Sequence, residues 1–254
     1  MTLDRCRNRL DWAKDHLKAL DDELAPFREA YADPPITIKC HKGGEVRDYY
    51  IDEVPVIPDR IGLRVSDCLH HLRSTLDNLI YSAAIAAPGH LSSSQLGALN
   101  FPLTEHPNAF AAELSKGAIA PLPAGAQTIV EGFQPYQRGK DAPWDTLAVL
   151  RKLSNRDKHR TLSVTGWHLR WAGHISSDRI RGVCFDVPLK NGAHFFQLRV
   201  GQEDRDVDVD IDFTFIITVQ DPAGVSGRPI NYWLEDIYTR IDQQVIPALR
   251  PFLS

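Results

Sequence analysis

Six polar side chains occupy consecutive positions where an apolar helix is expected to end, in the segment LSNRDKHR at 153–160. They are Asn155, Arg156, Asp157, Lys158, His159 and Arg160. Cations beside an amide can bind a phosphate, and histidine can transfer protons because its imidazole titrates near neutral pH. The same residue types can also stabilise a helix C-terminus or form a buried network. The segment therefore leaves a chemical and a structural interpretation open.

The chemical interpretation is based on one strip of residues along the expected helix. Arg151, Asn155 and His159 lie at positions i, i+4 and i+8, so they align on one partly exposed face. A cation, an amide and an imidazole in line can hold a phosphate, with His159 acting as acid or base. Arg156 and Arg160 would add positive potential. In the structural alternative, His159 and Arg160 only favour the negative end of the helix dipole.

The neighbouring, inward face of the same helix ends in a carboxylate. Leu150 and Ser154 point inward, and Asp157 continues their face if the helix extends by one more turn. A carboxylate that faces a core is stable only when it is paired. A second long helix offers Arg73, whose guanidinium can hold a carboxylate through two parallel hydrogen bonds. We therefore expect Asp157 to bind Arg73 and to dock the two helices.

That second helix has a polar strip of its own along one border of its apolar stripe. Ser66, His70, Arg73 and Asp77 recur at steps of three and four residues. Arg73 and Asp77 predict a local i, i+4 ion pair, and a half-buried arginine needs a carboxylate or carbonyl partner. The predicted polar network at the helix–helix junction consists of Arg73, Asp77, His70, Asp157, Lys158 and Arg160.

Two segments in this order resemble a bacterial family of uncharacterised proteins: LRSTLDNL at 72–79 and LSNRDKHR at 153–160. Members of that family carry an LRSALDHL-like helix, an FP loop, a PYQ-like turn and an NxDKHR-like segment. Phe101-Pro102 and the PYQ at 135–137 are similar to the FP loop and the turn. Asn78 stands where the family usually has histidine, so the role of that histidine does not transfer. The family has no established activity, and the resemblance implies no reaction.

The helices also resemble HEPN domains, all-helical folds whose ribonuclease members use an arginine and a histidine a few residues apart. That resemblance implies RNA cleavage through attack of the 2′-hydroxyl, usually in a dimer cleft. An RNA or nucleotide ligand and a homodimer therefore follow as expectations. The spacing here differs from the HEPN pattern, since Arg151 lies too far from His159 and Arg156 too close.

Composition narrows the function classes. The chain has 254 residues and a formal net charge of -4, which argues against nucleic-acid binding by an overall basic surface. No apolar run approaches the roughly 20 residues that a membrane helix needs, and charges begin at Asp4, so we expect no membrane segment and no signal peptide. Four scattered cysteines without a CxxC pair predict reduced thiols in a cytoplasmic protein. Neither a metal site nor a cofactor motif is indicated.

The periodicity of apolar residues predicts a single α+β domain over 1–254, a bundle of long N-terminal, central and C-terminal helices with an attached antiparallel β-sheet. The helical part is expected at 1–32, 59–160 and 229–254, and the β part at 35–54 and 161–220, with a hairpin at Gly43-Gly44. The C-terminal helix is expected to kink at Pro247 and to turn six apolar residues inward: Ile230, Trp233, Ile237, Ile241, Val245 and Leu249. A looser region at 89–142 carries loops and short helices near 108–115 and 124–133. Whether that region forms a lid or a pocket is left open.

Two functions of different classes remain. The first is a non-enzymatic accessory or interaction module, in which the polar network fixes the fold or a partner surface. It predicts that Arg73 and Asp157 are bonded and that His159 is covered. The alternative is a metal-independent, HEPN-like ribonuclease with His159 as acid or base and with Arg151, Arg156 or Arg73 stabilising charge on phosphate. It predicts that His159 is open to solvent beside an arginine.

Overall fold

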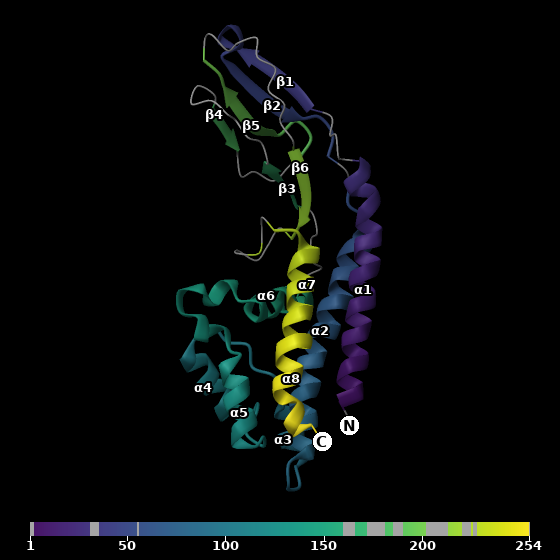
Figure 1. Ribbon diagram of the computed structural model, residues 1–254, viewed down its shortest axis with the longest axis vertical. Coiled ribbons are helices and arrows are strands. Elements are labelled where there is room, and N and C mark those ends of the chain that lie inside the picture. The colour runs from purple at the N-terminus through teal and green to yellow at the C-terminus, as the bar shows by residue number, and fades with distance from the viewer. Residues whose placement is uncertain are drawn as a thin grey trace.

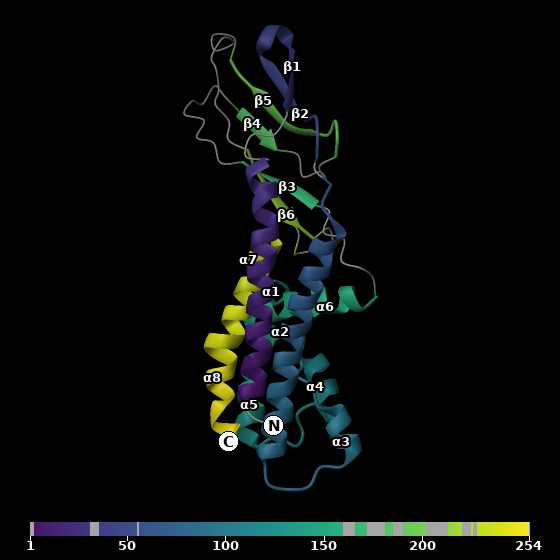
Figure 2. The same ribbon diagram turned by 90° about the vertical axis from the view of Figure 1, so that its right-hand side faces the viewer.

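The computed structural model describes residues 3–30, 36–54, 56–159, 166–171, 181–184, 190–201, 213–219, 225 and 228–253. The molecule is elongated, with a helical bundle at one end and β-strands at the other (Figures 1 and 2). The N- and C-termini lie at the end of the bundle away from the strands. The predicted α+β architecture, a helical bundle with antiparallel strands attached, is confirmed.

Two long helices, α1 (Leu3–Ala30) and α2 (Asp59–Ala86), run side by side along the bundle (Figures 1 and 2). Their sequences place apolar residues at steps of three and four, which puts one stripe of each helix in contact with the other. Leu10, Leu20 and Leu72 in these stripes are buried. Each such side chain contributes about 2–3 kcal/mol through removal of its surface from water.

The C-terminal helix packs against the same pair. It consists of α7 (Ile230–Arg240), a π-helical turn (Ile241–Val245) and α8 (Ile246–Leu249). The residues expected on its inward face are all buried: Ile230, Trp233, Ile237, Ile241, Val245 and Leu249. Where a kink was expected at Pro247, the helix has a π-helical turn directly before the proline. The reason is that proline offers no N–H to the preceding turn of the helix.

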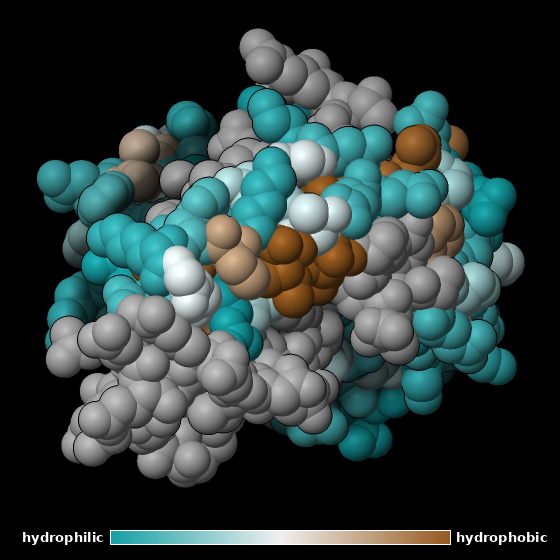
Figure 3. Space-filling model, turned by 90° about the horizontal axis from the view of Figure 1, so that it is seen from above, coloured by the Kyte–Doolittle hydropathy of each residue, from teal (hydrophilic) through white to brown (hydrophobic). Residues whose placement is uncertain are grey.

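The strands form two antiparallel sheets beyond the bundle. The larger sheet has the order β1-β2-β5-β4, from β1 (Ile36–His41), β2 (Val46–Ile51), β5 (His194–Arg199) and β4 (Arg181–Cys184). The smaller sheet pairs β3 (Gly166–Trp171) with β6 (Phe213–Thr218). The predicted hairpin at Gly43-Gly44 is confirmed, because both glycines have positive φ and join β1 to β2 in register Ile36↔Ile51. Seen from the strand end, most of the described surface is hydrophilic, with hydrophobic atoms gathered in a central area (Figure 3).

The region that follows α2 consists of short helices joined by loops. It contains α3 (Ser93–Ala98), α4 (Pro107–Ser115), α5 (Ala124–Gly132), a 3₁₀-helical segment (Pro135–Trp144) and α6 (Thr146–His159). The short helices expected near 108–115 and 124–133 are confirmed as α4 and α5. Helix α3 was not predicted, although its capping box, Ser92 with Gln95, is visible in the sequence.

Candidate functional site

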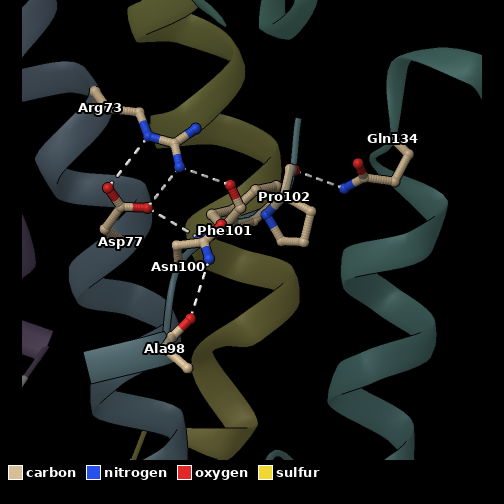
Figure 4. Close-up of polar contacts among 7 residues, drawn as sticks. All are labelled: Arg73, Asp77, Ala98, Asn100, Phe101, Pro102 and Gln134. Atoms are coloured by element: carbon tan, nitrogen blue, oxygen red, sulfur yellow. Dashed lines mark hydrogen bonds and ion pairs between the residues drawn. The ribbon is translucent and has the colours of Figure 1, made fainter. Parts of the chain in front are cut away.

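The Arg73–Asp77 pair on α2 holds a neighbouring stretch of chain in place. Arg73 Nε donates to Asp77 Oδ2 at 3.1 Å and Nη2 donates to Oδ1 at 2.9 Å, so the predicted i, i+4 pair is confirmed (Figure 4). The same Nη2 donates to the carbonyl of Phe101 at 2.8 Å, and the Phe101 N–H donates to Asp77 Oδ1 at 2.9 Å. The half-buried arginine thus has both partners that its position requires, a carboxylate and a carbonyl. We call residues 98–104 the docked segment.

Gln134 holds the docked segment from its other side. Its Oε1 accepts from the N–H and the hydroxyl of Thr104, both at 3.1 Å. Its Nε2 donates to the carbonyl of Pro102 at 2.8 Å (Figure 4) and to the carbonyl of Val130 at 3.0 Å. The side chain is 1% exposed, and both of its polar atoms are satisfied. Sequence reasoning missed this residue, because a glutamine in a loop gives no periodic signal.

The predicted bond between Arg73 and Asp157 is wrong. The Ser66 hydroxyl donates to Asp157 Oδ1, and no contact joins Asp157 to Arg73 within the described part of the chain. Helix α6 does extend far enough to carry Asp157, and this carboxylate does join α6 to α2 as expected. It meets α2 about two turns away from Arg73, because the crossing point of the helices is set by packing and not by charge.

A pocket of about 450 Å³ lies where the docked segment, α4 and α6 meet. This volume is in the range of roughly 300–1,000 Å³ that small-molecule sites occupy. Its lining includes Arg73, Phe101, Glu105, Arg151, Ser154 and Asn155. The structure therefore brings together three residues that the sequence singled out, Arg73, Arg151 and Asn155. The region at 89–142 provides one wall of the pocket, and the exposed Asn155 lies where the pocket meets solvent.

The charges around the pocket do not cancel. Glu105 pairs with Arg151 and also with Lys152, whose Nζ lies 3.4 Å from Glu105 Oε2. Two cations therefore share one carboxylate. The other charged lining groups are compensated locally, Arg73 by Asp77 and Glu113 by Lys116 at 2.7 Å. This leaves one net positive charge, at the α6 side of the pocket.

Two donors on that side are buried without a hydrogen-bond partner among the described residues, Arg151 Nε and Ser154 Oγ. Ser154 is 7% exposed, which confirms its predicted inward position. A buried polar group left unpaired costs about 1–3 kcal/mol. These two atoms therefore have a strong requirement for an acceptor, and both residues line the pocket. The sequence indicated the position of Ser154 but not this role.

The remaining residues of the 153–160 segment contribute less. His159 is the last residue of α6, but its side chain and that of Lys158 lie outside the described residues, as does the whole of Arg160. Their predicted roles stay predictions. Arg156 is half-buried and does not line the pocket.

His70 lies apart from the Arg73–Asp77 pair. It is exposed on α2, and its ring meets the edge of His71 at a centroid distance of 5.5 Å. His71 in turn stacks on His16 of α1 at 5.4 Å. Burial lowers the pKa of His71, and the neighbouring His16 and His70 lower it further. These rings form a contact between α1 and α2, and the pocket does not include them.

The described residues hold no group of three or more His, Cys, Asp or Glu side chains placed to bind a metal ion. Cys6, Cys40 and Cys68 are free thiols, and burial raises the pKa of Cys6 and of Cys68. None of the helices in the described ranges combines the length and apolar character of a membrane span.

Comparison with protein-family models, with curated proteins and with solved structures gives no match for this chain. The resemblances drawn from the 72–79 and 153–160 segments therefore stay predictions, and the geometry of the pocket carries the functional argument.

Proposed function

We propose that the protein is a non-enzymatic binding module and that its binding site is the pocket between the docked segment, α4 and α6. One observation supports this proposal above the others. The groups that hold the docked segment have their partners within the fold, whereas the buried Arg151 Nε and Ser154 Oγ have none among the described residues. A bound ligand would supply the missing acceptors.

Binding alone meets the requirement of these donors. The Ser154 hydroxyl bonds to no base in the described part of the chain, whereas a serine nucleophile needs an adjacent base. The docked segment, which forms one wall of the pocket, is also held from two sides, by Asp77 and by Gln134. Such a preformed wall reduces the conformational entropy that the protein must lose when a ligand binds.

The test is a thermal-shift screen of small polar compounds on the full chain. A ligand at a hundred times its Kd stabilises the folded state by about 2.7 kcal/mol, so binding raises the melting temperature in a saturable way. We expect Ala109→Trp, which fills the pocket from α4, to abolish the shift. Ala111→Trp is the matched control, because Ala111 is exposed on the same helix and does not line the pocket. Equal shifts in both variants would contradict the assigned site.

The ribonuclease is retained as a second candidate, because Arg151 and Asn155, two residues of its proposed strip, line the same pocket. Incubation of RNA with the wild type and with His159→Ala, without added metal, separates the two functions. The binding module predicts no cleavage by either protein. Cleavage by the wild type that His159→Ala removes would replace our proposal with the ribonuclease.

A further inference from the structure

We infer that the ligand of this pocket carries an oxyanion, a phosphate or a carboxylate, which accepts hydrogen bonds from Arg151 Nε and Ser154 Oγ. This inference rests on the proposed function and names its ligand class. The two donors are buried and have no partner among the described residues, and both residues line the pocket.

The donors are arranged for one acceptor group. Arg151 and Ser154 lie at i and i+3 on α6, and Asn155 follows at i+4, so the three side chains are neighbours on the surface of the helix. An ionised oxyanion has several lone pairs and accepts from two or three donors at once. Charge-assisted bonds of this kind are about twice as strong as those to a neutral carbonyl. An ammonium ligand has no lone pair, so it could not accept from Arg151 Nε or from the Ser154 hydroxyl.

The charges beside the pocket also favour an anionic ligand. Arg151 and Lys152 share Glu105, so this side of the pocket has one positive charge that the described residues do not neutralise. Arg73 is also available, since two of its nitrogens bond to Asp77 and Phe101 while the third points away from both (Figure 4). A bound anion would complete the balance in a partly enclosed site, where charge interactions are stronger than in water.

The opposite wall indicates more than a bare ion. The docked segment lines this side of the pocket with Asn100 and Thr104, beside Phe101, Pro102 and Leu103, which are buried, and α4 adds the exposed Ala109. A volume of about 450 Å³ exceeds what an inorganic phosphate fills. The geometry therefore fits a small organic molecule with an anionic head at α6 and a body that reaches the docked segment.

Isothermal titration of the full chain with a matched series of probes tests this. Phenyl phosphate and benzoate carry the anionic head, benzamide replaces it with a neutral group, and benzylamine replaces it with a cation. We expect at least one anion to bind about tenfold or more tightly than benzamide, and benzylamine not to bind. Inorganic phosphate should bind more weakly than phenyl phosphate. The comparison of phenyl phosphate with benzoate shows which oxyanion the site prefers.

Variants on α6 test the assigned donors. Arg151→Gln should weaken binding of the preferred anion about tenfold, and Ser154→Ala about fivefold. Lys152→Gln is the matched control: it removes the same charge from the same carboxylate, but Lys152 does not line the pocket. We expect it to weaken binding about threefold, less than Arg151→Gln does, because it lowers the positive charge beside the pocket but removes no direct contact. Equal losses for Arg151→Gln and Lys152→Gln would overturn the direct contact.

The failures of the two proposals are distinguishable. If benzamide or benzylamine binds as tightly as the anions, and Ala109→Trp still blocks it, the oxyanion is excluded while the binding module stands. If an anion binds equally well to the wild type and to Ala109→Trp, the assigned site is wrong. If neither the probes nor the screened compounds give a shift that Ala109→Trp removes, both proposals fail.

Discussion

The two sides of the pocket use similar residue types in different ways. On the side of the docked segment, Asp77 and Gln134 bond with every polar atom of their side chains to α2, to α5 or to the segment itself. On the α6 side, Arg151 and Ser154 line the same pocket with a buried donor each and no partner for it among the described residues. The two sides therefore differ in hydrogen-bond satisfaction more than in residue type, and under the proposed function the unpartnered donors bind the ligand.

The largest effect is expected at Gln134. Gln134→Ala leaves the Thr104 N–H and the Pro102 and Val130 carbonyls without their partner, so we expect a loss of about 3 kcal/mol in the free energy of unfolding. Urea denaturation measures it. Gln137→Ala is the control, because Gln137 is exposed and its bond to the Glu131 carbonyl is long, at 3.3 Å; it should cost less than about 0.5 kcal/mol. Similar losses for both would remove the structural role of Gln134.

A smaller loss is expected at Asp77. Asp77→Ala strands the Arg73 guanidinium and the N–H of Phe101, at a cost of about 2 kcal/mol, below that of a fully buried pair because Asp77 is 37% exposed. Asp21→Ala breaks an exposed pair with Arg28 and should cost less than about 1 kcal/mol. Chemical denaturation of the two variants in parallel measures both losses in the free energy of unfolding. If Asp21→Ala costs as much as Asp77→Ala, the Arg73–Asp77 pair stabilises the fold no more than an exposed ion pair does.

Asp157→Ala should be milder still. Its described partner is the Ser66 hydroxyl, so the expected loss is about 1 kcal/mol. Had Asp157 paired with a buried Arg73, the loss would be about 3–5 kcal/mol. A double-mutant cycle with Ser66→Ala checks the pair: the losses of the two single variants should not add. Additive losses would show that the contact contributes no stability.

The smallest effect on stability is expected at Ser154. Ser154→Ala removes a buried hydroxyl that has no partner among the described residues, so the free energy of unfolding should stay within about 0.5 kcal/mol of the wild type or rise slightly. Thermal and urea denaturation of the ligand-free protein measure this. A loss of more than about 1 kcal/mol would show that the hydroxyl is bonded within the fold, and the contrast between the two sides would disappear.

Local patterns in the sequence were sufficient for most of the architecture. The apolar spacing in α1, α2 and α7 predicted long helices and their inward faces, because a helix repeats on the scale of one turn. Gly43-Gly44 predicted the hairpin, since a tight turn there requires positive φ. Helix α3 was not predicted, although its capping box, Ser92 with Gln95, is a local signal.

The site depended on distant parts of the chain. Arg151 and Asn155 were identified from helical spacing, but their partners were not. Helical spacing shows on which side of the helix a residue lies, but it does not show which group of another element packs against that side. Glu105 reaches Arg151 from another element, and Gln134 bonds to Thr104 across 30 residues.

The sequence by itself determined which helices and strands form, and that Arg73 and Asp77 pair within one helix, because these interactions act over a few residues. Only the tertiary structure decided that Asp157 meets Ser66 instead of Arg73, and that Arg151 and Ser154 border a pocket. The physical reason is that the crossing of α6 over α2 follows from how their side-chain ridges pack, and a shift of about two turns along one helix exchanges every polar partner.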